Sequence, residues 1–397
     1  MPFFELPLHV GRPNIGDRAK LMARLNAMLD RRWLSNDGPL VQEFEARVAE
    51  YLGVKHVLAM CNATVALEIA YKAVGFSGEV ILPSYTFIAT AHALQWQGIS
   101  PRFVDIDPNS HNIDPKQIER HITPATTGIV GVHVWGRGCP VDEISAIAKK
   151  HNLKVVYDSS HAFGCSRDRL MLGNFGECEV FSFHATKFIN CFEGGVVVTN
   201  DDELAEKIRL MRNFGFKGYD QVDYLGVNGK MSEPCAAMGL TSFEAIDEII
   251  AINRRNYECY RDALANVAGV QVIEYNSSER NNFQYVVLDF DAAVARVSRD
   301  ELVQSLHAEN VIARKYFSPG CHRMEPYATL QPNAGNLLPE TERIASRVVV
   351  LPTGQTVDEP TVHSVCGIIR ECLQKRAGRQ ALNAGKQTEA SPDMARP

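Results

Sequence analysis

The chain has 397 residues, more than a single hydrophobic core usually organises, and this length predicts about two domains. Hydrophobic residues make up 45% of the sequence and charged residues 22%, so each domain can bury a core. The formal net charge of −6 gives no general attraction to phosphate backbones, which argues against a nucleic-acid partner.

The sequence has the features of neither a membrane protein nor a secreted one. It contains no run of about eighteen uncharged apolar residues, and residues 1–6 lack the basic and then apolar order of a signal peptide. The cysteines show neither a C-x-x-C pair nor a Cys/His spacing typical of zinc, so we expect reduced thiols and no metal site. These features predict a soluble cytoplasmic protein.

The predicted elements begin with two helices and continue as an alternation of strands and helices. Apolar residues at helical spacing predict helices over 17–30 and 41–52. Short β-rich runs then recur between helical stretches, a pattern typical of a mostly parallel sheet covered by helices. The predicted strands cover residues 79–82, 102–105, 128–133, 154–158, 179–183 and 195–199.

Beyond these strands the pattern changes. A long helical pattern over 238–267 predicts a bridge out of the first domain, and strands are expected over 283–290 and 347–351. Ser298 and Glu301 have the spacing of a capping box, which marks the start of a helix between the two strands.

These elements divide the chain into three parts. We predict an α/β large domain over residues 1–250 and a smaller α+β domain over residues 251–375. Residues 376–397 are polar and nearly free of large apolar side chains, so they predict a disordered tail.

Lys187 lies in a segment whose residue types suit a covalent cofactor anchor. Residues 181–187 read FSFHATK and end a predicted strand, and a glycine pair follows at 194–195. Proteins with α/β folds present reactive groups at the carboxyl ends of strands, where a lysine amine can form a Schiff base with an aldehyde cofactor. Most lysines are solvated surface charges, so this interpretation depends on what surrounds Lys187.

Other segments carry groups that would complete such a site. Asp158 ends a predicted strand; it could simply cap a helix, but beside Lys187 it could keep a proton on the ring nitrogen of a pyridine cofactor. Ala63 and Thr64 begin a helical pattern, and the amino terminus of a helix can bind phosphate. Phe87 offers a flat face against which a ring can stack.

Taken in order, these segments resemble the sugar aminotransferases of the fold-type I pyridoxal phosphate (PLP) superfamily, the DegT/DnrJ/EryC1/StrS family. The resemblance extends from about residue 8 to about residue 372. It implies a large domain with a mixed, mostly parallel sheet between helices and a smaller α+β carboxyl-terminal domain. The motifs that carry it are WLSN at 33–36, CNAT at 61–64, PSYTF at 83–87, VHVWG at 132–136, DSSH at 158–161, FSFHATK at 181–187, EGG at 193–195, NGKMSE at 228–233 and YFSPGCH at 316–322.

The resemblance implies a role for each cofactor-binding position. Lys187 would hold PLP as a Schiff base and carry the proton that moves during amino transfer, and Asp158 would pair with the ring nitrogen. His161 would lie near the 3-oxygen of the ring, where family members have Gln or His, and Phe87 would lie against the ring. The residues implied to hold the phosphate are Ala63, Thr64 and Ser182, together with Asn228 of the partner subunit. The active sites would therefore be shared within a homodimer.

Some of these residues also have ordinary structural interpretations. Ser182 could be a strand-end hydroxyl and His161 a hydrogen-bonded core histidine. We expect His184, although it lies in the lysine motif, to pack or to form hydrogen bonds behind the reacting groups. Ser159 and Ser160 stand where the family usually has alanines. Because serine and alanine are both small, this difference does not weaken the roles implied for Asp158 and His161.

For the substrates, the resemblance implies L-glutamate as amino donor and a nucleotide-linked keto-sugar as acceptor. The sequence is most similar to enzymes that aminate C4 of dTDP-4-keto-6-deoxy-D-glucose in deoxy-aminosugar pathways, including antibiotic biosynthesis. Cationic and hydroxyl side chains suit the diphosphate of such a sugar. The candidates are Lys217, Lys230, Arg314, Lys315, Tyr316 and His322.

Several other functions are compatible with parts of this pattern. The nearest is the same transfer to C3 of a dTDP-3-keto-6-deoxy sugar, which would need the same cofactor site. PLP-dependent sugar dehydratases place a histidine where this chain has Lys187, and a PLP-binding regulator would keep the fold without turnover. A nicotinamide dehydrogenase is excluded because no G-x-G-x-x-G opens a helix after a strand.

Overall fold

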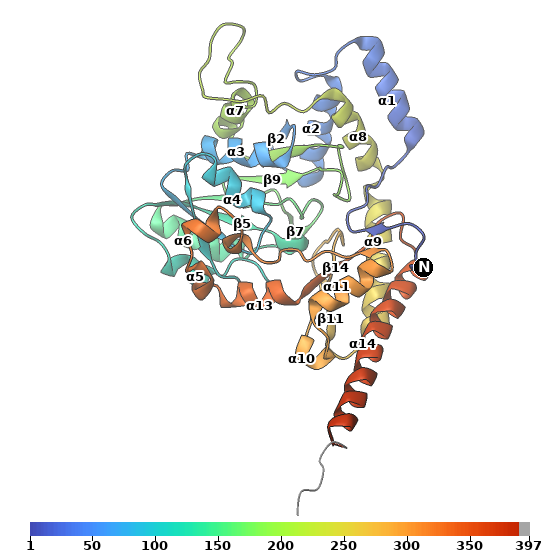
Figure 1. Cartoon of the computed structure of the whole chain (residues 1–397). Coiled ribbons are helices and arrows are strands. Elements are labelled where there is room, and N and C mark those ends of the chain that lie inside the picture. The colour runs from blue at the N-terminus through green and yellow to red at the C-terminus, as the bar shows by residue number, and fades with distance from the viewer. Residues whose placement is uncertain (389–397) are drawn as a thin grey trace, which may run out of the picture.

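The computed structural model describes residues 1–388 of the chain, with side chains described as far as residue 374. One group of elements is built on a seven-stranded sheet and a second on a three-stranded sheet (Figure 1). We call these groups the large domain and the small domain. The predicted α/β fold class is confirmed by this arrangement.

The seven-stranded sheet of the large domain is parallel except for one strand. Its strands are β2 (His56–Met60), β3 (Glu79–Pro83), β4 (Ser100–Val104), β5 (Thr126–Val132), β6 (Lys154–Asp158), β9 (Cys178–Ser182) and β10 (Gly195–Thr199). Their order across the sheet is β2-β10-β9-β6-β5-β3-β4, and β10 runs antiparallel to both of its neighbours. The sequence pattern located all of these strands except β2.

Helices cover both faces of this sheet. They are α1 (Arg18–Arg31), α2 (Pro39–Leu52), α3 (Ala63–Val74), α4 (Ile88–Gln95), α5 (Pro115–Arg120), α6 (Val141–His151), α7 (Asp202–Met211) and α8 (Glu233–Glu244). Successive residues of a strand point to opposite faces, so Val196 and Val198 pack with α2 and α8 while Val197 packs with α3 and α7. The helices predicted over 17–30 and 41–52 are confirmed as α1 and α2.

The long helical pattern predicted over 238–267 forms two helices instead of one. After α8, α9 covers Ile246–Leu264, and Ala245 between them leaves helical geometry with φ −97° and ψ 9°. The first turns of α9 pack in the large-domain core and its later turns in the small-domain core, so α9 is the expected bridge. Neither Gly nor Pro marks the break, which is why the pattern did not locate it.

The small domain contains an antiparallel sheet of β11 (Val270–Val272), β12 (Val286–Phe290) and β14 (Val348–Leu351), in that order. It packs with α9, α11 (Arg299–Ala308) and α14 (Glu359–Thr388). Ser298 and Glu301 form the predicted capping box at the start of α11. Near the amino terminus, β1 (Leu8–His9) pairs in parallel with β13 (Val311–Ile312).

Several short elements complete the fold. They are the hairpin β7 (Ser166–Arg167) and β8 (Leu170–Met171), the 3₁₀ turns Val134–Gly136, Cys321–Arg323 and Ala334–Leu337, and the helices α10 (Ala292–Ala295), α12 (Tyr327–Leu330) and α13 (Pro339–Arg347). Asp105, just after β4, accepts hydrogen bonds from the backbone N–H groups of Glu340 and Thr341 at 2.9 and 2.8 Å. This contact caps α13 and fixes the segment that precedes β14 against the large domain.

The structure differs from the sequence prediction at the carboxyl-terminal tail. Helix α14 continues to Thr388, so residues 376–388 are helical where a disordered tail was predicted. Eight of the 13 residues in this stretch are Ala, Arg, Gln or Lys, which are good helix formers, although Gly378 and Gly385 are not. Residues 389–397, the rest of the predicted tail, lie outside the described residues.

The topology places several chain segments at one edge of the seven-stranded sheet. The carboxyl ends of β3, β5, β6 and β9 meet there, and β10 begins at the same edge. Open α/β sheets bind their ligands at this edge. Among the described residues, no helix is long and apolar enough to cross a membrane.

Candidate active site

A cavity of about 430 Å³ opens at the carboxyl edge of the sheet. Most of the predicted cofactor residues line it: Ala63, Thr64, Phe87, Asp158, His161, Ser182 and Lys187. A larger cavity of about 780 Å³ lies at the opposite edge, but it includes neither Lys187 nor Asp158. The smaller cavity is therefore the candidate active site.

Lys187 reaches this cavity from the turn that follows β9. Its backbone N–H donates to the carbonyl of His184 at 2.8 Å, and its Nζ donates to the hydroxyl of Tyr285 at 3.3 Å. Burial lowers the pKa of Lys187 to about 8, against the opposing effects of Asp158 and Tyr316, which favour the charged amine. A lysine with this pKa supplies a free amine near neutral pH, which nucleophilic attack on a carbonyl requires.

Asp158 is buried at the end of β6, and its carboxylate is held by two donors. The Thr90 hydroxyl donates to Oδ2 at 2.8 Å, and the Ser160 backbone N–H donates to Oδ1 at 3.1 Å. Thr90 is itself hydrogen-bonded to the Thr86 hydroxyl at 2.8 Å. The carboxylate therefore has a fixed orientation at the wall of the cavity.

His161 is buried beside Asp158 and is held as a neutral ring. The backbone N–H of Trp135 donates to Nδ1 at 3.3 Å, which leaves Nε2 to carry the ring proton. Burial, followed by the nearby charge of Lys187, lowers the pKa of His161 well below its usual value. The ring stacks on Phe317 with centroids 5.4 Å apart. His161 can therefore donate one hydrogen bond from a fixed position.

The predicted phosphate turn lies at the amino terminus of α3. Asn62 caps this helix by accepting from the Val65 N–H at 2.9 Å. The N–H groups of Ala63 and Thr64 belong to the first turn and have no partner within the helix. A Cβ at Gly195 would lie 2.7 Å from the Ala63 nitrogen, so glycine is what allows β10 to pass this close to the helix start.

These residues fit PLP. The cavity offers an amine for the aldehyde, a fixed carboxylate for the ring nitrogen, a neutral histidine for the ring oxygen and first-turn N–H groups of a helix for the phosphate. Phe87, at the start of α4, is half exposed and presents its ring to the same space. Ser182 lines the cavity beside the helix start.

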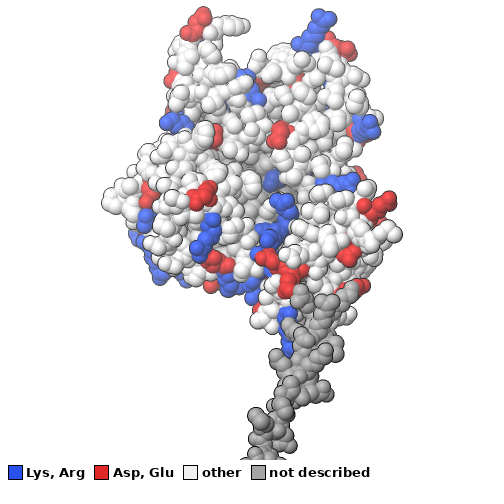
Figure 2. Space-filling view, in the orientation of Figure 1, with Lys and Arg blue, Asp and Glu red and all other residues white. Residues whose placement is uncertain are grey.

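The predicted substrate residues divide into two groups. Arg314 and Tyr316 line the cavity, and the Arg314 guanidinium lies 5.1 Å from the centre of the Tyr316 ring. Lys315, between them, does not line it and instead pairs with Asp300 at 3.1 Å. Figure 2 shows Lys and Arg side chains gathered near the middle of the view, where the two domains meet.

Lys217, Lys230 and Asn228 lie outside the lining of this cavity. Lys217 pairs with Asp223 at 3.7 Å, and Lys230 donates to the Asn213 side chain at 2.8 Å. Asn228 forms a backbone bridge with Asn213. All three belong to the connection between α7 and α8, so within one chain they do not reach the cofactor site.

The structure corrects the expectation for His322. Its side chain is buried, its Nδ1 hydrogen-bonds to the Ser84 hydroxyl at 2.7 Å, and its Nε2 pairs with Glu342 at 2.8 Å. Both ring nitrogens are therefore engaged in joining β3 to α13, and neither is available to a diphosphate. A histidine in a motif could not be assigned to this role without its three-dimensional neighbours.

His184 was expected to pack or form hydrogen bonds behind the reacting groups, but it lines the cavity and its side chain is 46% exposed. It hydrogen-bonds to the Thr186 hydroxyl at 2.8 Å and pairs with Glu193 at 3.4 Å, at the rim of the cavity. Sequence reasoning missed the role of Tyr285, which contacts Lys187, and that of Thr90, which orients Asp158. Tyr285 lies in the predicted strand over 283–290, but nothing in the sequence indicates that this strand meets the lysine.

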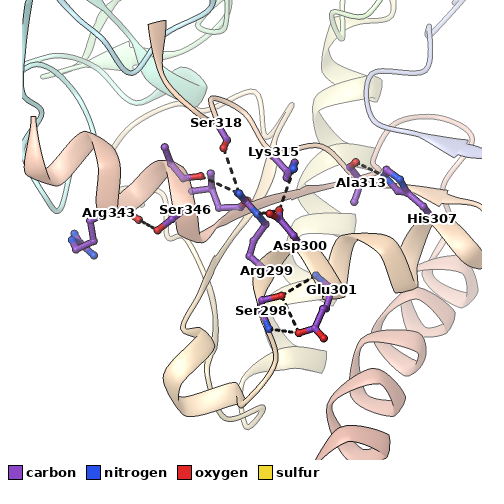
Figure 3. Close-up of polar contacts among 12 residues, drawn as sticks. Ser298, Arg299, Asp300, Glu301, His307, Ala313, Lys315, Ser318, Arg343 and Ser346 are labelled. Atoms are coloured by element: carbon purple, nitrogen blue, oxygen red, sulfur yellow. Dashed lines mark hydrogen bonds and ion pairs between the residues drawn. The ribbon is translucent and has the colours of Figure 1, made fainter. Parts of the chain in front are cut away.

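Arg299 fixes the loop that carries Arg314 and Tyr316 (Figure 3). Its guanidinium donates to the carbonyls of Ala345 and Val348 at 2.9 and 3.2 Å, and to the Ser318 hydroxyl at 3.4 Å. The next residue, Asp300, holds Lys315, as described above. The start of α11 therefore anchors the substrate side of the cavity.

Comparison with known proteins agrees with this site. Residues 16–370 match the model of the DegT/DnrJ/EryC1/StrS aminotransferase family. A dTDP-4-amino-4,6-dideoxy-D-glucose transaminase from Shigella dysenteriae is 37% identical over 92% of this chain and 99% of the relative, and one from Escherichia coli is 34% identical over 91% and 97%. Among solved structures, DesI in the presence of its TDP-sugar product is 48% identical, with a TM-score of 0.92 and 97% of each chain covered. The chain therefore belongs to the DegT/DnrJ/EryC1/StrS aminotransferase family and is a PLP-dependent sugar aminotransferase.

Proposed function

We propose that this enzyme transfers the amino group of L-glutamate to C4 of dTDP-4-keto-6-deoxy-D-glucose. The observation that carries this proposal is the similarity to two relatives named dTDP-4-amino-4,6-dideoxy-D-glucose transaminase, each of which matches more than nine-tenths of the chain. The likeness to DesI, whose structure contains a TDP-sugar product, supports the same nucleotide.

Bound PLP would act as the electron sink that lets an amino group leave one carbon and join another. The Lys187 amine, with its lowered pKa, holds the cofactor and carries the proton between carbons. Asp158, fixed by Thr90 and Ser160, keeps a proton on the ring nitrogen. His161, which is neutral and donates through Nε2, supports the ring oxygen.

Both substrates carry anionic groups, and among the residues that the structure describes Arg314 is the one Lys or Arg that lines the cavity besides Lys187. A guanidinium can form two parallel hydrogen bonds with a carboxylate or a phosphate. Tyr316 places its ring beneath this guanidinium, which limits the positions that Arg314 can take. We therefore assign anion recognition to Arg314 and Tyr316.

We further propose a homodimer in which Asn228 of the partner subunit completes the phosphate site. The connection between α7 and α8, which carries Asn228, exposes large apolar side chains that a partner could cover. They are Phe214, Tyr219, Val222, Tyr224, Leu225 and Val227. Lys217 and Lys230 lie on the same connection and would approach the substrate only from the partner subunit.

A panel of acceptors tests the proposed function. Purified holoenzyme with L-glutamate should give the highest kcat/KM for the dTDP-linked 4-keto-6-deoxy sugar, and Lys187→Ala should give no product. A preference for a dTDP-3-keto-6-deoxy sugar would replace the proposal with C3 amination. Preference for the GDP-linked sugar would contradict the proposed nucleotide, and this arm is needed because a GDP-perosamine synthase is 34% identical to this chain.

A further inference from the structure

Residues 281–285, in the small domain, reach across to the loops that carry the cofactor residues. The Asn282 side chain donates to the carbonyls of His161 and Phe163 at 2.9 and 3.0 Å. Asn282 is fully buried, and its Oδ1 accepts from the Gln284 N–H at 2.9 Å. This segment is therefore held to the loop that follows β6.

The same segment also holds the lysine loop at two consecutive residues. The Gln284 side-chain oxygen accepts from the Phe188 N–H at 3.1 Å, and the Tyr285 hydroxyl accepts from Lys187 Nζ at 3.3 Å. Because one contact fixes the backbone and the other the side chain, the position of the Lys187 amine depends on the small domain.

Tyr285 itself is rigidly placed. Its side chain is buried, its ring meets the edge of His161 with centroids 4.8 Å apart, and its carbonyl accepts from the Tyr275 hydroxyl at 2.6 Å. Burial raises the pKa of Tyr285 well above its usual value, so the phenol keeps its proton throughout the working pH range.

Transamination requires the Lys187 amine to change its protonation state. When the amine takes a proton from the donor carbon it becomes an ammonium, and when it delivers that proton it becomes a free amine again, with no net change. An ammonium needs an acceptor, whereas a free amine can also use a donor. A neutral hydroxyl supplies both, which a carboxylate or a carbonyl cannot do.

We propose that Tyr285 is a further catalytic residue, whose hydroxyl holds the Lys187 amine in place in both of the protonation states that amino transfer requires. This inference rests on the proposed function for its kinetic consequence. The contact itself, and its effect on the amine, can be measured without a sugar substrate.

Other groups near Lys187 determine how the proposal must be tested. Asp158 and Tyr316 favour the ammonium, and His161 is neutral. Glu193 and Arg314, which carry opposite charges, also line this cavity. Because all of these groups stay in place when one hydroxyl is removed, Tyr285→Phe isolates the contribution of Tyr285.

The matched control is Tyr260→Phe. Tyr260 is buried in the small-domain core with α9 and α14, and its hydroxyl donates to the backbone carbonyl of Pro352 at 3.1 Å, away from Lys187. Both variants lose one buried hydroxyl, so both should lose a similar amount of stability. Any further difference between the two variants in pH midpoint or kcat then reflects the loss of the contact with Lys187.

The first measurement uses apoprotein and PLP alone. The rate of Schiff-base formation, followed by absorbance, depends on the fraction of free Lys187 amine and should have a pH midpoint near 8 in the wild type. The charge-assisted bond from the ammonium to the Tyr285 hydroxyl is stronger than the bond that the free amine forms with it, so Tyr285→Phe should lower the midpoint by roughly 0.5–1 pH unit. Tyr260→Phe should leave it unchanged.

The second measurement uses holoenzyme. Tyr285→Phe should lower kcat for the glutamate half-reaction by about 10- to 100-fold with little change in KM, and Tyr285→His, which keeps a donor and an acceptor, should recover part of the loss. The proposal would be overturned if Tyr285→Phe kept the wild-type pH midpoint and the wild-type kcat. It would also be overturned if Tyr260→Phe lost as much kcat as Tyr285→Phe, or if Tyr285→His had a lower kcat than Tyr285→Phe. If wild-type enzyme fails to transfer an amino group at all, the proposed function fails, while the midpoint shift still decides the role of Tyr285.

Discussion

Lys187 is partly buried, and this burial opposes the charge that a lysine normally carries. Burial lowers its pKa in the folded protein from 10.5 to about 8. Between these two values the unfolded chain binds one proton more than the folded chain, so the free energy of unfolding rises with pH across that window. Below pH 8 both states are protonated, and the buried ammonium costs the folded protein stability.

This cost predicts that removing the charge stabilises the apoprotein. Lys187→Met should raise the free energy of unfolding at pH 7 by up to about 3 kcal/mol, the upper value that the change in pKa allows. The side chain is partly exposed, which reduces the effect. Urea denaturation of both apoproteins from pH 7 to pH 11 measures it. The stability difference should shrink as pH rises above 8, and a wild type that is the more stable protein at pH 7 would contradict the assignment.

The second prediction for a single residue concerns Asp158 and the rate of amino transfer. Asp158→Asn keeps an oxygen for the Thr90 hydroxyl or the Ser160 N–H but removes the negative charge that we propose keeps the ring nitrogen protonated. The variant should still bind PLP, with kcat reduced by at least about 100-fold. Cofactor absorbance after gel filtration measures the bound PLP, and steady-state kinetics measure kcat. A fully active variant would refute the ring-nitrogen role.

At the scale of elements, the start of α3 and the start of β10 are in close contact, so a change in one displaces the other. Gly195→Ala would place a Cβ 2.7 Å from the Ala63 nitrogen and so displace the N–H groups offered to the phosphate. We expect the Kd for PLP to rise by about 10- to 100-fold, measured by fluorescence titration of the apoprotein. Gly367→Ala is the control, because a Cβ there meets open space within α14. Equal PLP affinity in both variants would contradict a phosphate site at this helix start.

The elements also explain what could be predicted from sequence. The strand pattern places Asp158 at the end of β6 and Lys187 just after β9, and the structure brings both to one cavity because parallel strands end at a common edge. The break at Ala245 carries no local signal, and the contact of Tyr285 with Lys187 arises only when two domains pack. His322 belonged to a recognisable motif, but its partners Ser84 and Glu342 are distant in sequence.

At the scale of the whole molecule, the proposed sharing of active sites between two subunits has a quantitative consequence. Asn228 lies away from the cavity of its own chain, so Asn228→Ala should impair only the site of the partner subunit. A heterodimer of Lys187→Ala and Asn228→Ala, purified through two different affinity tags, contains one site with both residues intact. It should have about half the wild-type activity per dimer, although each variant homodimer is nearly inactive. An inactive heterodimer, or a monomeric wild type in analytical ultracentrifugation, would contradict the shared site.

The central claim is that glutamate nitrogen becomes the C4 amine of a dTDP-linked 6-deoxy sugar. The most direct measurement supplies the holoenzyme with ¹⁵N-labelled L-glutamate and dTDP-4-keto-6-deoxy-D-glucose, and follows the label by ¹H–¹⁵N NMR. We predict a ¹⁵N resonance coupled to the proton on C4, absent with Lys187→Ala. Label at C3, or an unchanged keto-sugar after complete loading of the enzyme with PLP, would contradict the claim.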